Sequence, residues 1–223
     1  MKNKHHIPIT RPYISRDEKE LILRPLETSW LTQGPFVEQF ENMIKEYTGA
    51  KYAIATSSCT TALELALKLI GIKPDDEVIA PSFTFVATFN AIEHIGAQPR
   101  FCDIELDDFN ISPDDLKKRI TSKTKAIMVV HQFGYPAKMD EIIEIANEYG
   151  LKIVEDCACS LGSFYKNKHT GLFGCAGCFS FHPRKLITTG EGGMIITNDD
   201  KLATAARILR SQGAIRSDYV RHK

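Results

Sequence analysis

The sequence has no apolar run near the ~20 residues that a membrane-spanning helix requires. It also lacks an excess of charge of one sign, because 28 Lys and Arg residues balance 28 Asp and Glu residues. This balance does not support nonspecific binding to nucleic acid or to an anionic membrane surface. Six cysteines in 223 residues are too few for a secreted disulfide scaffold. The proline-containing segment 7–12 is not the apolar core of a signal peptide. We therefore expect a cytoplasmic protein with reduced thiols.

Several catalytic signatures are missing as well. There is no phosphate-binding G-x-x-x-x-G-K-[ST] loop, no G-x-S-x-G nucleophile elbow and no H-E-x-x-H zinc helix. Two cysteine pairs, Cys157 with Cys159 and Cys175 with Cys178, leave structural zinc as an alternative. The C-x-C spacing is atypical of zinc knuckles and the second pair runs into an apolar strand, which favours small buried thiols and no metal.

Apolar strands alternate with amphipathic helices from residue 51 onward. Strands are predicted at 51–56, 77–80, 100–104, 126–130, 153–156, 178–181 and 194–196, and helices at 36–47, 61–70, 86–95, 139–149 and 201–209. This alternation indicates an α/β layer fold with a mainly parallel sheet. Ligands of such sheets collect at the carboxyl ends of the strands. The polar residues at predicted strand ends are Thr56, Ser57, His131, Asp156 and Ser180.

Lys185 and Asp156 are the most informative pair. Lys185 follows a short apolar strand and precedes the glycine-rich run 189–193, and Asp156 ends a buried strand. A lysine that forms a Schiff base and a carboxylate that pairs with the pyridinium nitrogen are the groups that hold and tune pyridoxal phosphate (PLP). A buried carboxylate needs such a partner. For Asp156, a structural ion pair or a helix N-cap remains the alternative.

Other residues fit the same hypothesis less specifically. The run 57–61 precedes a helix, so its N–H groups and hydroxyls could cradle a phosphate, although Ser58 or Thr60 could simply cap the helix. Ser180 could add a hydroxyl. Phe85 could stack on the cofactor ring or belong to the core. His131 could line the pocket, but a hydrogen-bonded structural histidine is favoured.

The chain resembles the DegT/DnrJ/EryC1/StrS family of PLP-dependent sugar aminotransferases over nearly its whole length. The matching segments are SWLTQGP (29–35), SCTTAL (58–63), PSFTFVAT (81–88), Asp156, FSFHPRK (179–185) and TTGEGG (188–193). Agreement at many separated sites is more specific than any single motif. The resemblance implies the large domain of the fold type I aminotransferases. It also implies transfer of an amino group, commonly from glutamate, to a keto group of a nucleotide-linked sugar.

The resemblance also implies roles for individual residues. Lys185 would form the Schiff base and carry a proton between the substrate α-carbon and C4′ of the cofactor, and Asp156 would contact the pyridine nitrogen. Phosphate and ring contacts would come from Thr60, Ser180, the amide region of Cys59 and Phe85. Two departures stand out: Cys159 replaces a glutamine that many relatives direct at the phenolic oxygen, and Cys59 replaces a glycine of the phosphate turn. The presence of Lys185 disfavours the dehydratase branch, in which histidine replaces it.

The expected organisation is an N-terminal arm (1–35), a PLP-binding large domain (36–215) and the start of a connection (216–223) to a C-terminal domain that this chain lacks. Relatives are expected to form homodimers with shared active sites, in surface-polysaccharide or antibiotic-sugar biosynthesis. Without the C-terminal domain, we expect weak PLP binding and slow turnover. The alternative is an inactive or non-transaminating relative that keeps the fold as a binding or scaffold protein.

Overall fold

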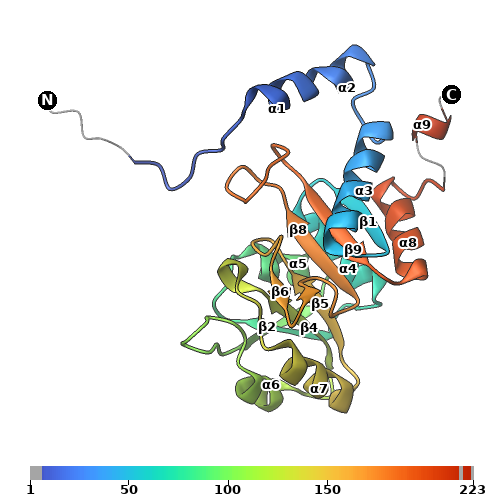
Figure 1. Cartoon of the computed structure of the whole chain (residues 1–223). Coiled ribbons are helices and arrows are strands. Elements are labelled where there is room, and N and C mark those ends of the chain that lie inside the picture. The colour runs from blue at the N-terminus through green and yellow to red at the C-terminus, as the bar shows by residue number, and fades with distance from the viewer. Residues whose placement is uncertain (1–6, 216–217, 222–223) are drawn as a thin grey trace, which may run out of the picture.

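The computed structural model describes residues 7–215 and 218–221, which build a seven-stranded sheet of order β1-β9-β8-β5-β4-β2-β3 (Figure 1). Its strands are β1 (Tyr52–Thr56), β2 (Glu77–Pro81), β3 (Gln98–Cys102), β4 (Thr124–Val130), β5 (Lys152–Asp156), β8 (Ala176–Ser180) and β9 (Gly193–Thr197). Only β9 runs antiparallel to its neighbours, β1 and β8. The pairings among β8, β5, β4, β2 and β3 are all parallel. The predicted mainly parallel α/β sheet is therefore confirmed.

The strand predicted at 100–104 is displaced in the structure. It begins at Gln98 and ends at Cys102, because its register with β2 runs from Glu77 opposite Gln98 to Pro81 opposite Cys102. The sequence pattern missed its start because Pro99 cannot donate a ladder hydrogen bond. On an edge strand such as β3, that missing donor is tolerated.

Helices cover both faces of the sheet. They are α3 (Pro35–Thr48), α4 (Cys59–Leu69), α5 (Ala87–His94), α6 (Pro113–Arg119), α7 (Met139–Tyr149) and α8 (Asp200–Arg210), with the 3₁₀ turn η1 (Gln132–Gly134), the hairpin β6 (Phe164–Tyr165) and β7 (Lys168–His169), and the terminal α9 (Asp218–Arg221). Along β4, Ala126 and Met128 pack with α4, α5 and α8, whereas Ile127 and Val129 pack with α6 and α7. This two-residue alternation produces a three-layer core. Helix α3 packs on β1 and β9 in a separate cluster.

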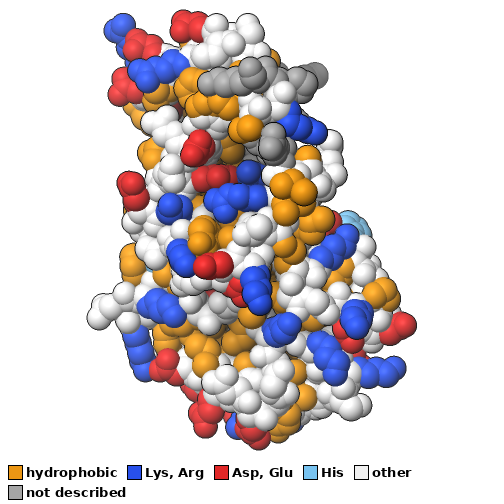
Figure 2. Space-filling view, turned by 90° about the vertical axis from the view of Figure 1, so that its right-hand side faces the viewer, with side chains coloured by type: hydrophobic (Ala, Val, Ile, Leu, Met, Phe, Trp, Pro, Cys, Tyr) orange, Lys and Arg blue, Asp and Glu red, His pale blue; other side chains and the backbone are white. Residues whose placement is uncertain are grey.

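The segment before α3 carries two short helices, α1 (Arg16–Leu21) and α2 (Leu23–Glu27), that have no buried residue and project from the body of the molecule (Figure 1). Leu21, Ile22, Leu23 and Leu26 are 50–65% exposed. Figure 2 shows hydrophobic side chains at this end of the molecule, and basic and acidic side chains interspersed over the face in view. No helix within the described ranges is long and apolar enough to cross a membrane. Of the predicted connection 216–223, four residues lie outside the described ones.

Candidate active site

A cleft of about 530 Å³ opens where β4, β5 and β8 end and α4 begins. All seven residues that the sequence suggested for a cofactor site line it: Cys59, Thr60, Phe85, Asp156, Cys159, Ser180 and Lys185. They come from four separate segments of the chain, 59–60, 85, 156–159 and 180–185. The parallel connections bring these segments to one edge of the sheet, as expected for an α/β fold.

Asp156 forms the buried floor of this cleft. Its side chain accepts hydrogen bonds from Thr88 Oγ1 at 2.9 Å and from the Ala158 N–H at 3.1 Å. Burial raises the pKa of the Asp156 carboxyl, and these hydrogen bonds and the charge of Lys185 oppose that shift only in part. Among the described residues, no cation lies within ion-pair distance of Asp156. The alternative of a structural ion pair is therefore not supported, and the carboxylate faces the cleft without a cation at ion-pair distance among the described residues.

Thr88 is the site residue that the sequence reading missed. It is fully buried on α5, and its hydroxyl joins Asp156 to Thr84 Oγ1, which lies 2.8 Å away. Thr84 lies before α5, and its hydroxyl is within hydrogen-bond distance of the Thr88 hydroxyl four residues later. That spacing, directly after a strand end, was the available signal. Thr88 fixes the orientation of the Asp156 carboxylate.

Lys185 lies on the loop between β8 and β9. The loop is closed at its base by the hydrogen bonds Phe181 N–H to Gly192 O (2.9 Å) and Thr189 N–H to Phe181 O (3.0 Å). A turn in which the Lys185 N–H donates to His182 O at 2.8 Å directs the side chain into the cleft. There, Nζ lies 3.2 Å from Cys159 Sγ, so Cys159 is the nearest polar neighbour of the amine that the structure records.

The N-terminus of α4 presents free backbone donors to the cleft. Ser58 caps the helix: its Oγ accepts from the Thr61 N–H, and Thr61 Oγ1 accepts from the Ser58 N–H, each at 3.1 Å. The predicted capping alternative thus holds for Ser58, yet the N–H groups of Cys59 and Thr60 still have no partner within the helix. The Cys59 thiol donates to Cys178 O at 3.4 Å and lies in the core.

Gly193 makes this arrangement possible. A Cβ built there would lie 2.3 Å from the Ser58 carbonyl and 2.6 Å from the Cys59 nitrogen. The start of β9 therefore approaches the helix start more closely than any residue with a side chain allows.

His131 lines the cleft, as the sequence analysis allowed, and forms a structural pair with Glu155. His131 is fully buried, its Nε2 lies 2.9 Å from Glu155 Oε2, and its Nδ1 accepts from the Ala137 N–H at 3.1 Å. Both ring nitrogens are satisfied by the neutral tautomer protonated at Nε2. The preferred prediction, a hydrogen-bonded structural histidine, agrees with these contacts.

A metal site is not favoured at this position. His131, Glu155 and Cys157 bring ligand atoms within 4.8 Å of one another, and this is the one such group of three or more found among residues 7–215 and 218–221. The carboxylate of Glu155, however, already accepts from the N–H groups of Gly171, Phe173 and Gly174, each at 2.7 Å. The two cysteine pairs do not gather into a four-cysteine group within the described residues.

Replacing Glu155 by glutamine is expected to lower the free energy of unfolding by about 3 kcal/mol, because an amide cannot accept all four hydrogen bonds and loses their charge assistance. Urea unfolding checks this value, with Glu144→Gln on the exposed side of α7 as the matched control. A loss no larger than that of the control would show that Glu155 does not hold the 171–174 segment.

The residues present fit PLP. A buried carboxylate without a counter-charge suits a protonated pyridine nitrogen, an accessible amine suits an aldehyde, and an uncovered helix N-terminus suits a phosphate. These three features line a single cleft.

Comparison with known proteins agrees with this chemistry. The chain is 42% identical over 216 residues to GDP-perosamine synthase of Escherichia coli O157:H7, covering 96% of this chain and 59% of that protein. It is 42% identical over 221 residues to the spore coat polysaccharide biosynthesis protein SpsC of Bacillus subtilis, covering 99% of this chain and 57% of that protein. The solved structure of DesV from S. venezuelae, in complex with a ketimine intermediate, superposes with a TM-score of 0.87 at 38% identity, over 92% of this chain and 55% of that one.

The chain therefore spans a little under three fifths of the curated relatives that it matches. The family model of the PLP-dependent DegT/DnrJ/EryC1/StrS aminotransferases matches residues 12–223. With this match, the parallel sheet and the cleft at its carboxyl edge, the chain belongs to the DegT/DnrJ/EryC1/StrS aminotransferase family.

Proposed function

We propose that this chain binds PLP and moves an amino group from an amino acid, glutamate in the first instance, to a keto group of a nucleotide-linked sugar. The observation that carries the proposal is the convergence of the Lys185 amine, the Asp156 carboxylate and the start of α4 on one cleft. GDP-perosamine synthase and SpsC, both 42% identical, support a nucleotide-sugar substrate and a place in polysaccharide biosynthesis.

PLP, when bound, supplies an electron sink for the negative charge that develops on the reacting carbon. Asp156 would pair with the pyridine nitrogen and keep it protonated, because a buried carboxylate favours a cationic partner. Thr88 keeps the carboxylate in line through its 2.9 Å hydrogen bond. The Lys185 amine would hold the cofactor through its aldehyde, with loss of water, and as a free amine it would carry a proton between the substrate α-carbon and C4′.

The remaining cleft residues position the cofactor. The Thr60 and Ser180 hydroxyls and the Cys59 N–H hold its phosphate at the positive end of the α4 dipole. Phe85, 67% exposed at the cleft, covers the ring. The Cys159 thiol would contact the phenolic oxygen of the cofactor, as a weaker hydrogen-bond donor than an amide. We expect the bound cofactor to depend chiefly on Asp156 for its electronic tuning.

We further propose a homodimer in the cytoplasm, with 36–215 as the PLP-binding domain. The exposed leucine and isoleucine side chains of α1 and α2 have the character of a surface that another subunit covers. All six cysteines are free, as is usual in a reducing compartment. Sedimentation velocity of the PLP-loaded chain measures the oligomeric state, and a monomer at all concentrations would contradict the dimer.

Borohydride reduction after incubation with PLP, followed by peptide mass mapping, tests the function directly. A phosphopyridoxyl group confined to the peptide that carries Lys185 is expected. Addition of glutamate before the borohydride is expected to remove that label, because the amine is then released from the cofactor. Label scattered over surface lysines, or none at all, would overturn the proposal and favour a non-catalytic binding role.

A further inference from the structure

Three phenylalanine rings that the proposed reaction does not use meet at the cleft: Phe83 and Phe133 line it, and Phe109 packs against both. Phe83 lies between β2 and α5, Phe109 between β3 and α6, and Phe133 in η1, and we call these three rings the aromatic wall. Their centroids lie 5.4, 6.1 and 6.3 Å apart. They are 44%, 41% and 70% exposed, respectively. Contiguous exposed aromatic surface of this kind marks a binding site more often than a packing defect.

Two members of the wall are held in strained backbone. Phe109 has φ +61° and Phe133 has φ +54°, in the left-handed region that bulky residues rarely adopt. Strain of this kind persists where the surroundings impose it, and it concentrates at ligand clamps. Burial does not compensate for it at Phe133, whose side chain is largely exposed. The strained backbone therefore holds the Phe133 ring in an exposed position.

A buried asparagine holds the wall together. Asn110 is 1% exposed, and its side chain accepts from the Gln132 N–H at 2.9 Å and donates to Tyr135 O at 3.2 Å. These bonds tie the segment that carries Phe109 to both ends of η1. On the other side, Ser163 Oγ donates to Gly134 O at 2.6 Å. The rings are thus presented by a fixed scaffold, which lowers the entropy cost of binding a ligand.

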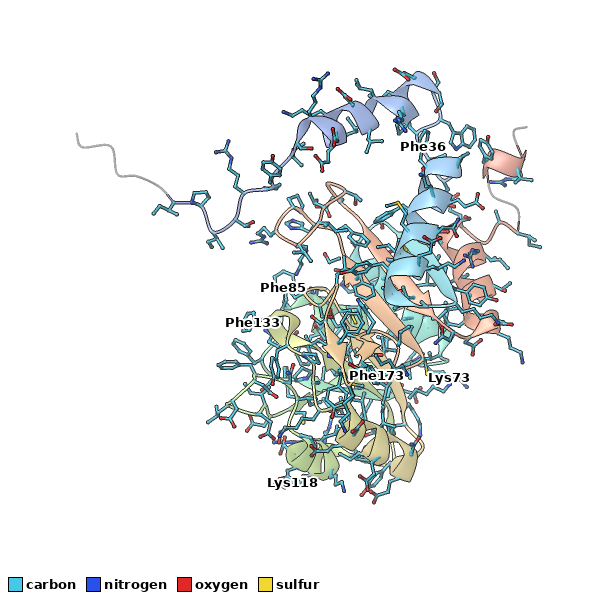
Figure 3. The ribbon with its side chains drawn as sticks, in the orientation of Figure 1. Phe36, Lys73, Phe85, Lys118, Phe133 and Phe173 are labelled. Carbon is cyan, nitrogen blue, oxygen red and sulfur yellow. The ribbon has the colours of Figure 1, made fainter. Side chains whose placement is uncertain are left out.

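The wall continues the candidate active site. Phe83 and Phe133 line the same cleft as Lys185 and Asp156, and Figure 3 shows Phe85 and Phe133 on the same side of the molecule. Asp156 is 6% exposed at the floor, whereas Phe133 is 70% exposed at the rim. Phe133 meets its two neighbours at 65° and 78°, edge to face, so a face of its ring stays open.

We propose that the aromatic wall binds the nucleobase of the nucleotide-linked sugar by stacking. This inference rests on the proposed function. If the keto sugar lies beside Lys185 deep in the cleft, the diphosphate extends toward solvent and the base lies at the outer edge of the cleft. Aromatic side chains stack on the π-face of any base, so the wall contributes affinity for nucleotides without choosing among bases.

Calorimetric titration of the PLP-loaded chain with GDP, UDP, TDP, inorganic pyrophosphate and a hexose 1-phosphate tests this inference. Phe133→Leu keeps an apolar side chain but removes the ring, and it is expected to weaken binding of the nucleoside diphosphates about 5- to 100-fold. Pyrophosphate and the hexose phosphate are expected to bind as before. Tyr149→Leu, which removes a 44% exposed ring at the end of α7, is the matched control and is expected to change nothing.

Phe133→Asn separates binding from folding. Asparagine tolerates positive φ, so this variant is expected to unfold at a higher temperature while losing the same nucleotide affinity. Equal losses for hexose phosphate and nucleotides would mean that the wall holds the sugar, and would overturn the proposal. A changed sedimentation coefficient with unchanged nucleotide affinity would do so too, by assigning the wall to a second copy of the chain.

The two proposals fail in different ways. If PLP and borohydride label Lys185 but nucleotides bind no better than pyrophosphate, the proposed function stands and the role of the aromatic wall is wrong. If nucleotides bind more tightly than pyrophosphate only when the Phe133 ring is present, and Lys185 is not labelled, the proposed function is wrong and the cleft is a nucleotide-binding site.

Discussion

Lys185→Arg is expected to abolish covalent trapping of PLP and to slow amino transfer from glutamate to bound PLP by about 10³-fold or more. Arginine keeps the positive charge, but its guanidinium stays protonated and can neither bond to the aldehyde nor accept a proton from carbon. Noncovalent PLP binding is expected to persist, because the phosphate and pyridine contacts come from other segments. The half-reaction with glutamate, followed by absorbance, needs no sugar substrate and isolates this step.

Lys118→Arg is the matched control for that experiment. Lys118 is exposed in the last turn of α6, away from the cleft (Figure 3). The Lys118→Arg variant should retain covalent trapping of PLP and the full rate of the half-reaction with glutamate. If Lys185→Arg also retained both, another amine would have to do the chemistry, and the role proposed for Lys185 would be wrong.

Asp156→Asn is expected to have opposite effects with and without the cofactor. With PLP, loss of a charge-assisted contact to the pyridine nitrogen is expected to weaken binding about 10- to 100-fold. Without PLP, the substitution is expected to stabilise the chain at neutral pH, because it removes a carboxylate whose charge is buried without a partner at ion-pair distance. The amide can still accept from the Ala158 N–H and can donate to Thr88 Oγ1.

The pH dependence of the apo chain follows from the same burial. The pKa of the Asp156 carboxyl is raised in the folded state, so the folded chain holds a proton that the unfolded chain has released. The free energy of unfolding therefore falls as pH rises from about 4, the unfolded value, through the folded pKa. Asp156→Asn is expected to abolish the contribution of this carboxyl to the pH dependence of the free energy of unfolding.

Urea unfolding at several pH values, with and without PLP, measures both effects. The exposed residue Asp107 provides the control, as Asp107→Asn. An Asp156→Asn chain that is less stable than the wild type at neutral pH without PLP would contradict the account. It would mean that the hydrogen bonds from Thr88 and Ala158 outweigh the cost of burying the charge.

Local patterns in the sequence carried most of the fold. Continuous apolar runs and helices ending at glycine predicted the order of elements, because such runs are typical of strands buried on both faces of a parallel sheet. Lys185, Asp156 and Ser180 could be proposed because strand ends of a parallel sheet share one edge. The start of β3 was missed, since an edge strand tolerates Pro99 and only its pairing with β2 reveals that it is an edge.

By itself, the sequence determined the α/β class and the family, and it was sufficient to propose the residues for the cofactor chemistry. These depend on periodicity and on short motifs that are contiguous in the chain. Only the tertiary structure decided that Thr88 orients Asp156, that the thiol of Cys59 lies in the core while its N–H faces the cleft, and that Phe83, Phe109 and Phe133 meet at one rim. The physical reason is that each of these contacts joins segments distant in sequence, and their distance is set by how the layers pack rather than by any local preference.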